Sequence, residues 1–259
     1  MPDSPYRLHG EPVTARVLLP LRIEGERIRD LICDEIDGTL IYEGDIIVNR
    51  ASSLLNLAPR RTIGRLGHVL SDPASTWPNG TIPIDVPADM RPLVDQAIAR
   101  WEAATPLRFP SATGHQDHVA FKWSGRNGSR VGRHGGQQLI ELEEGASVRT
   151  AVHEIGHTVG LYHEHSRPDA DEHIQVHFDN VTPGAGSQFT QPVSSRTHGV
   201  YDYDSVMHYD AFAFSRNGQP TITTRTGASI GHLDELSTGD RAACRLLYPD
   251  LDWPGDLMG

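Results

Sequence analysis

The stretch Val152–Asp171 reads VHEIGHTVGLYHEHSRPDAD and holds three histidines at the spacing of a metal site. His153 and His157 are four positions apart. On a helix they share one face, one turn apart, so both imidazoles can reach a single cation. Glu154 points slightly around the helix, where it could contact a water on the metal without being a ligand. The spacing therefore predicts a helix that carries a metal site.

A helix end is expected at Gly160, because glycine can adopt a left-handed conformation that stops a helix and reverses the chain. That reversal would bring His163 to the same ion as a third nitrogen ligand. Three protein ligands with one open position are the arrangement of a catalytic zinc, whereas structural sites close all four positions. HExxH alone also occurs as two histidines on an ordinary helix. The longer HExxHxxGxxH pattern favours one zinc ion per chain.

A second motif follows at Ser205–Tyr209, which reads SVMHY. HEIGHTVGLYHEHSRPDAD resembles the HExxHxxGxxHExxRxDRD signature of the astacin family of metzincin zinc metalloendopeptidases, and SVMHY resembles that family's SxMHY Met-turn. The likeness extends from about Trp77 to Tyr248 and indicates a bacterial-type member with an N-terminal pro-segment. One departure is Ala170, where the family usually has arginine. That change could weaken an ion pair but touches no expected metal ligand.

The resemblance implies a role for each residue that matches the family motifs. The implied zinc ligands are His153, His157 and His163, and the implied general base is Glu154. Tyr209 is expected to contact zinc at rest and then to stabilise the transition state. Glu164 is expected to pair with the N-terminus exposed by activation, and Met207 to make a hydrophobic floor under the histidines.

A non-peptidase zinc hydrolase on a similar scaffold is the less favoured alternative, because both motifs are intact.

The fold class expected from the resemblance is α+β, of the metzincin-like zincin type. Its catalytic domain should hold a twisted, mostly parallel sheet with an antiparallel edge strand, an active-site helix, and two subdomains that flank a cleft. A small pro-segment should precede it. We expect a pro-segment and activation linker at 1–65, an astacin-like catalytic domain at 66–250 and a C-terminal tail at 251–259.

Within the expected pro-segment, Ala15–Glu24 and Thr39–Asn49 are rich in Val, Ile and Leu and favour strands, with a charged stretch from Glu24 to Asp30 between them. From Arg50 to Gly67 the chain is mixed and basic. This segment is either a solvated linker or an activation linker that is cut between about Arg60 and His68.

Tyr42-Glu43-Gly44-Asp45-Ile46 is similar to the FEGDI box of astacin propeptides. In that box the aspartate reaches the zinc and displaces the catalytic water, so Asp45 is the expected latch and Gly44 would let the backbone approach closely. The alternative is a turn with an exposed acid. Cys33 is a rival latch, because a thiolate binds zinc strongly. It could equally be a small buried hydrophobe or form a disulfide with Cys244.

The spacing of apolar residues, together with the residues that start or stop helices and strands, predicts the regular elements of the expected catalytic domain. His134 is expected in a loop rather than at the metal. The predicted elements are a helix at Asp89–Thr105 with Asp89 as its N-cap, a strand at His118–Ser124, an edge strand at Gln137–Glu143, the active-site helix at Val148–Leu161, a helix at Leu236–Leu247 capped by Ser237 or Thr238, and a loose tail from Tyr248.

The net charge and the distribution of apolar residues limit the kinds of partner that this chain is expected to bind. The 259 residues carry a formal net charge of −11 at pH 7, which argues against nucleic acid or an anionic membrane. No run approaches the ~18 apolar residues of a membrane span. We therefore expect protein or peptide substrates, no nucleic acid and no membrane, with the oligomeric state unknown.

The sequence itself gives little evidence on where the protein is located. The opening MPDSPYRLHG lacks the basic and apolar regions of a secretory signal, and two cysteines cannot make a disulfide-dense scaffold. A secreted or extracellular location is therefore implied by the family alone, with an exported effector as the alternative. The functional expectation is a zinc-dependent endopeptidase made as a latent zymogen. A stable inactive zymogen or binding protein that retains a structural zinc is the alternative.

Overall fold

The computed structural model describes residues 15–23, 26–36, 38–50, 75–189 and 199–253. The predicted activation cleavage between about Arg60 and His68 lies outside the described residues.

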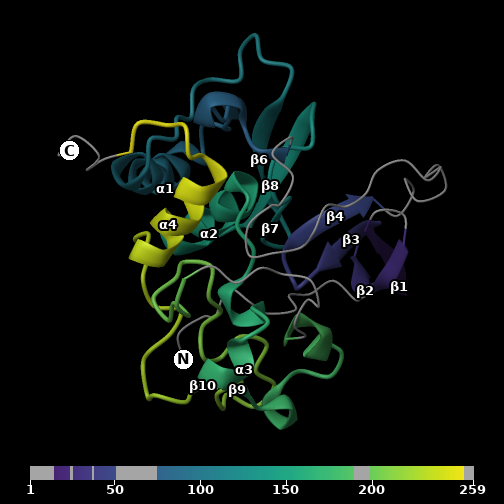
Figure 1. Ribbon diagram of the computed structural model, residues 1–259. Helices are drawn as coiled ribbons and strands as arrows, with labels where there is room; N and C mark the ends of the chain where they lie inside the picture. The colour runs from purple at the N-terminus through teal and green to yellow at the C-terminus, as the bar shows by residue number, and fades with distance from the viewer. Residues whose placement is uncertain (1–14, 24–25, 37, 51–74, 190–198, 254–259) are drawn as a thin grey trace.

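Eight strands form one mixed sheet in the order β1-β2-β3-β4-β7-β8-β6-β5 across the described residues (Figure 1). The pro-segment strands β1 to β4 are antiparallel neighbours. In the catalytic part, β5, β6 and β8 are parallel and β7 is antiparallel to β8. The expected α+β fold with a mostly parallel sheet is therefore confirmed. The strands span Ala15–Ile23 (β1), Glu26–Ile36 (β2), Thr39–Tyr42 (β3), Ile46–Arg50 (β4), Ile84–Asp85 (β5), His118–Ser124 (β6), Gly128–Ser129 (β7) and Gln137–Glu143 (β8).

The predicted edge strand is placed wrongly. Gln137–Glu143 is a strand as expected, but it pairs with β6 on one side and with β7 on the other. Beyond β7 the sheet continues into the expected pro-segment, because Ile46 of β4 pairs in parallel with Ser129. Alternating hydrophobicity predicts a strand but carries no information on which neighbours it will find. Strands β1 to β4 thus extend the sheet formed by β5 to β8.

The charged stretch Glu24–Asp30 was not predicted as a strand, yet most of it belongs to β2. That strand is the partner of β1, with Ala15 opposite Glu35 at one end and Ile23 opposite Glu26 at the other. Ladder pairing with β1 overrides the weak strand preference of charged residues. The predicted strand Thr39–Asn49 is divided into β3 and β4 by a turn at residues 43–45.

Helix α1 spans Arg91–Ala104, and its start differs from the prediction. Met90 occupies the N-cap position, where no side chain caps the helix. The Asp89 carboxylate instead accepts a hydrogen bond from Trp123 Nε1 at 2.7 Å. The predicted cap is therefore wrong, because a tertiary partner on β6 competes for the same carboxylate. At the other end of the helix, Trp101 Nε1 donates to Val152 O at 3.0 Å and so joins α1 to the active-site helix.

Helix α4 spans Thr238–Leu247 and begins as expected at Ser237. A full capping box is present: Ser237 Oγ accepts from the N–H of Asp240, and the Asp240 carboxylate accepts from the N–H of Ser237. The loose tail predicted from Tyr248 is wrong for residues 248–253. Tyr248 and Trp253 are buried in the core, and Trp253 Nε1 donates to Tyr248 O at 3.0 Å.

Two hydrophobic cores divide the catalytic part into two subdomains (Figure 1). The first lies among α1, α2, α4 and the parallel strands; the second gathers residues from Ala170 to Ile230. Its elements are the helix α3 (Ala170–His173), the strands β9 (Ile174–Val176) and β10 (Ile222–Thr224), and the short 3-10 helices η5 (Phe178–Asn180) and η6 (Ala185–Phe189). Two other 3-10 turns, η3 (Pro78–Gly80) and η4 (Glu164–Ser166), lie in the first subdomain and just after α2.

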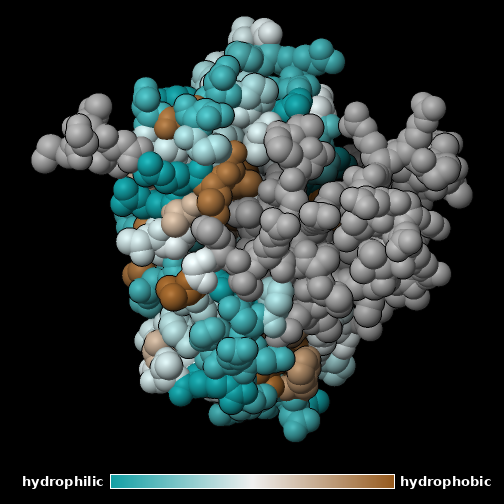
Figure 2. Space-filling view, in the orientation of Figure 1, coloured by the Kyte–Doolittle hydropathy of each residue, from teal (hydrophilic) through white to brown (hydrophobic). Residues whose placement is uncertain are grey.

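The described surface in the orientation of Figure 2 is mainly hydrophilic, with apolar residues in small separate groups. Of the helices in the described ranges, none is long and apolar enough to cross a membrane.

Candidate metal centre and active site

Helix α2, Val148–Val159, carries the first two histidines of the motif. Ser147 caps its first turn by accepting a hydrogen bond from the N–H of Thr150. It ends at Val159, two residues before the predicted bound at Leu161, and Gly160, with a φ of 125°, is its C-cap. Leu161 N–H turns back to Gly156 O at 2.9 Å, so the chain reverses as the glycine predicted.

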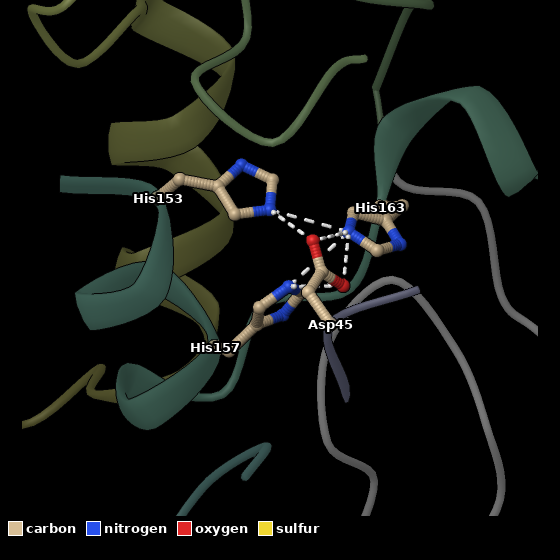
Figure 3. A group of neighbouring side chains, drawn as sticks. All are labelled: Asp45, His153, His157 and His163. Carbon is tan, nitrogen blue, oxygen red and sulfur yellow. Dashed lines mark hydrogen bonds and ion pairs between the residues drawn. The ribbon is translucent and has the colours of Figure 1, made fainter. Parts of the chain in front are cut away.

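The reversal brings His163 to the other two histidines. His163 Nε2 lies 3.2 Å from both His153 Nε2 and His157 Nε2, and all three side chains are buried (Figure 3). Three imidazole nitrogens that face one another at this separation point to one shared position. The convergence predicted from spacing is therefore present in the structure.

Asp45 enters the same position from the pro-segment (Figure 3). Its carboxylate oxygens lie 3.3 Å from His153 Nε2, 3.6 Å from His157 Nε2 and 3.1 Å from His163 Nε2. One ligand atom from each of the four residues lies within 4.8 Å of the others. Three imidazole nitrogens and one carboxylate oxygen are a set of four donors of the kind that binds zinc.

In each of the three histidines, the second ring nitrogen, Nδ1, faces away from the shared position and has a hydrogen-bond acceptor. His153 Nδ1 lies 2.7 Å from Val206 O, and His157 Nδ1 lies 2.8 Å from Leu161 O. His163 Nδ1 instead lies 2.9 Å from Glu43 Oε2. Acceptors of this kind orient a metal-binding imidazole and select the tautomer that presents Nε2. The third acceptor, Glu43, was missed as a site residue, although it stands inside the quoted YEGDI box.

Charges in this buried cluster are strongly coupled. Burial would lower the pKa of His163, but the carboxylates of Asp45 and Glu43 raise it to about 9. Burial lowers the pKa of His153 to about 3, although its hydrogen bond to Asp45 opposes the shift. Burial opposes ionisation of Asp45, but the charge of His163 and hydrogen bonds from the three histidines hold its pKa well below the usual range. The two carboxylates therefore favour the protonated form of His163 in the metal-free cluster.

Glu154 projects from the same helix and is not among the four donors. It is buried, and its Oε2 has no hydrogen-bond partner in the described structure. Burial raises the pKa of this carboxyl well above its usual range, and the carboxylates of Asp45 and Glu141 raise it further. A buried carboxyl oxygen without a partner, next to a metal-type donor set, suits a group that acts on a water or a substrate there.

Tyr209 lies fully buried beside the histidines, with its ring 3.7 Å from that of His165 and 4.7 Å from that of His163 between centroids. Its hydroxyl donates a hydrogen bond to the backbone carbonyl of Glu43. A backbone carbonyl in the turn between β3 and β4 therefore holds the Tyr209 hydroxyl.

Gly44 makes this approach of the pro-segment sterically feasible. Its φ is +81°, and a Cβ there would lie 2.7 Å from the Phe214 ring and 3.1 Å from Tyr209 Oη. The close backbone approach expected of this glycine is thus confirmed.

Met207, expected under the histidines, packs against Gly156 of α2, next to His157 in the sequence. A Cβ on Gly156 would collide with Met207 Sδ, so the glycine between the two helical histidines makes room for the sulfur. Glu164 Oε1 accepts hydrogen bonds from Arg167 Nη1 at 3.1 Å and from the N–H of Asp202 at 2.8 Å. Burial raises the pKa of Glu164 to about 8, although Arg167 opposes the shift. In this structure, which contains residues before the expected cleavage site, the ionic partner of Glu164 is Arg167.

Cys33 is not part of the donor group. It is buried in β2, and Cys33 and Cys244 are both free thiols, so the proposed disulfide is not formed. Burial raises the pKa of the Cys33 thiol to about 12, with Asp34 contributing, which disfavours the thiolate that binds metals. His134 lies in a loop as expected, with Nε2 3.0 Å from Val131 O.

Two histidines four apart on a helix, a third beyond a glycine turn and a methionine beneath them define a metzincin-type metal centre. The chain belongs to the astacin family, since the model of the peptidase family described as Astacin matches residues 69–249. The zinc cofactor expected from the sequence is confirmed for this family and agrees with the donor set.

Several relatives agree with this assignment. Zinc metalloproteinase nas-6 of Caenorhabditis elegans is 39% identical over 71% of this chain and 56% of its own length. Nematocyst expressed protein 6 of Nematostella vectensis is 31% identical over 86% of this chain and 83% of its own length. The chain thus spans between about half and four fifths of such relatives. These are animal proteins and lend no support to a bacterial type.

A solved structure gives the same fold. The zinc-protease High choriolytic enzyme 1, a hatching enzyme from Oryzias latipes, matches with a TM-score of 0.63 and 26% identity. The match covers 68% of this chain and 95% of that one.

Proposed function

We propose that this chain is a zinc-dependent endopeptidase made in a latent form, in which the pro-segment blocks the metal. The observation that carries the proposal is the buried donor set of three histidines closed by one pro-segment carboxylate, Asp45. A catalytic zinc needs an open fourth position. Occupation of that position by a removable segment agrees with latency.

The proposed roles follow from where each group lies. His153, His157 and His163 hold the zinc, which when bound polarises the scissile carbonyl and activates water. Glu154 takes the proton of the attacking water and later delivers it to the leaving amine. The Tyr209 hydroxyl, released from Glu43, donates a hydrogen bond to the oxygen that becomes negative in the transition state. Protein or peptide substrates are those expected of an astacin-family protease.

The expected domain boundaries are 1–65, 66–250 and 251–259, but Trp253 lies in the first hydrophobic core, so the proposed catalytic domain extends from 66 to at least 253. The family match at 69–249 is compatible with the middle division. A secreted location is proposed from the family, with an exported effector as the alternative. Asp45, rather than Cys33, is the proposed latch, because Asp45 is one of the four converging donors.

The proposal is tested by comparing the intact chain with the chain cut in the segment from Arg60 to His68. The cut chain should hydrolyse a denatured protein and contain one zinc ion, and a chelator should abolish the activity until zinc is restored. The intact chain should contain zinc and remain inactive. Absence of zinc from both forms would contradict the metal site, and an inactive cut chain that retains zinc would contradict the enzymatic proposal.

The alternative of a stable inactive zymogen or binding protein predicts that the pro-segment stays attached. Mass spectrometry after incubation separates the two accounts. A cut between about Arg60 and His68 favours the protease. An intact chain that cannot be activated by added proteases favours the binding protein.

Tyr209→Phe in the cut chain is expected to lower kcat by about 10²–10³-fold with little change in KM, because removal of one preorganised donor affects mainly the transition state. Steady-state kinetics on a peptide checks this. Tyr203→Phe is the matched control, since its hydroxyl bonds only to His173 O at 3.3 Å. An unchanged kcat in Tyr209→Phe would remove this hydroxyl from the mechanism.

A further inference from the structure

The outer nitrogens of the three metal histidines have acceptors from different parts of the chain. Val206 O and Leu161 O belong to the catalytic part and stay there when the pro-segment leaves. The acceptor for His163 is the carboxylate of Glu43, which departs with the pro-segment. Of these three acceptors, Glu43 is the one that comes from the pro-segment.

The contacts of Glu43 hold its carboxylate in place. Its side chain is buried, and Oε2 accepts hydrogen bonds from His163 Nδ1 at 2.9 Å and from Ser166 Oγ at 3.2 Å. Its backbone carbonyl accepts from the Tyr209 hydroxyl. The backbone of Glu43 has a φ of 48°, which is unfavourable for a residue with a side chain and persists only where surrounding contacts impose it.

We infer that Glu43 is a positioning residue that the pro-segment supplies to the zinc site, so that the latent chain binds zinc more tightly than Asp45 alone would allow. The inference rests on the proposed zinc site and latency. A carboxylate behind a metal-binding imidazole fixes its orientation and increases its basicity, and loss of such a partner typically costs 10–100-fold in metal affinity. The pro-segment would thus promote loading of the metal as well as block it.

Zinc affinity of the uncut chain tests this inference. Competition with a chromophoric chelator should show Glu43→Ala binding zinc about 10–100-fold more weakly than the unchanged chain. Glu43→Gln should lose less, because an amide oxygen still accepts a hydrogen bond but without the charge. Glu35→Gln is the matched control: it lies on the neighbouring strand β2, is half-buried, and is not in the donor group.

A role limited to docking of the pro-segment must be distinguished. Ser166→Ala removes the other hydrogen bond of the same carboxylate and leaves His163 with its partner. Its zinc affinity should stay within a few-fold of the unchanged chain. The visible spectrum of the Co²⁺-loaded uncut chain should change in Glu43→Gln and not in Ser166→Ala, since it reports on the ligand geometry.

The outcomes separate the inference from the function on which it rests. If the unchanged chain binds no zinc, the proposed metal site is wrong. If it binds zinc and Glu43→Gln binds equally tightly with an unchanged Co²⁺ spectrum, only the role of Glu43 is overturned. Equal losses in Ser166→Ala and Glu43→Gln would likewise overturn it, in favour of docking alone. Should Glu43→Ala fail to fold by circular dichroism, the isosteric Glu43→Gln decides.

Discussion

Glu154→Ala is expected to leave zinc bound and to lower kcat of the cut chain by about 10²–10⁴-fold, the usual contribution of a general acid–base group. Zinc should remain because Glu154 is not one of the four donors. The rate should fall because Glu154 is buried beside this centre and its Oε2 has no hydrogen-bond partner in the described structure, whereas the buried Glu141 forms ion pairs with Lys122 and Arg126. Metal analysis and steady-state kinetics on one preparation check both parts.

The matched control for this experiment is Glu144→Ala, which removes an exposed carboxylate just before helix α2. Its kcat should be unchanged. Near-normal hydrolysis by Glu154→Ala would exclude the carboxyl as the base. Loss of zinc from that variant would show that Glu154 supports the metal rather than the proton transfer.

Asp45→Ala is expected to make the uncut chain active, with a rate at least about 100-fold above that of the unchanged uncut chain. The reason is that Asp45 closes the fourth position of the donor set and is buried among three histidines. Removal of one partner from a buried ionic group typically costs about 3–5 kcal/mol, which favours undocking of the pro-segment by about two orders of magnitude or more. Hydrolysis of a short peptide measures the effect, and intact mass before and after the assay verifies that no cut has occurred.

Glu35→Ala serves as the control, because it truncates another pro-segment carboxylate that is not in the donor group. That chain should stay latent. A silent, zinc-loaded Asp45→Ala chain would show that the remaining contacts maintain latency without the carboxylate. Those contacts are the pairing of β4 with β7 and the hydrogen bonds to Glu43.

The proposed pro-segment contacts the rest of the chain at several sites. Asp45 meets the histidines, Glu43 meets His163 and Tyr209, and β4 pairs with β7. A further buried contact joins Asp34 Oδ2 to Gln188 Nε2 at 3.0 Å, and Gln188 O lies 3.1 Å from His165 Nε2. Since His165 stacks on Tyr209, the pro-segment also packs indirectly against the group proposed to stabilise the transition state.

Local sequence determined the parts of the site that depend on short-range geometry. Spacing alone placed His153 and His157 on one helical face, and Gly160 ended that helix because only a residue without a side chain adopts its φ of 125° readily. These two features involve a few neighbouring residues whose conformations are dictated by sterics. The placement of Asp45 among the histidines was expected from the resemblance of the YEGDI box to astacin propeptides, and the left-handed turn at Gly44 lets that segment approach closely.

Tertiary structure decided which groups meet across long separations. The Asp89 carboxylate accepts a hydrogen bond from Trp123 instead of capping the helix, and Gln137–Glu143 pairs with a strand on both sides instead of lying at the edge of the sheet. Glu43 became the acceptor of His163, 120 positions away. The physical reason is that a carboxylate or a strand edge accepts many partners of similar energy, and only the packed fold selects among them.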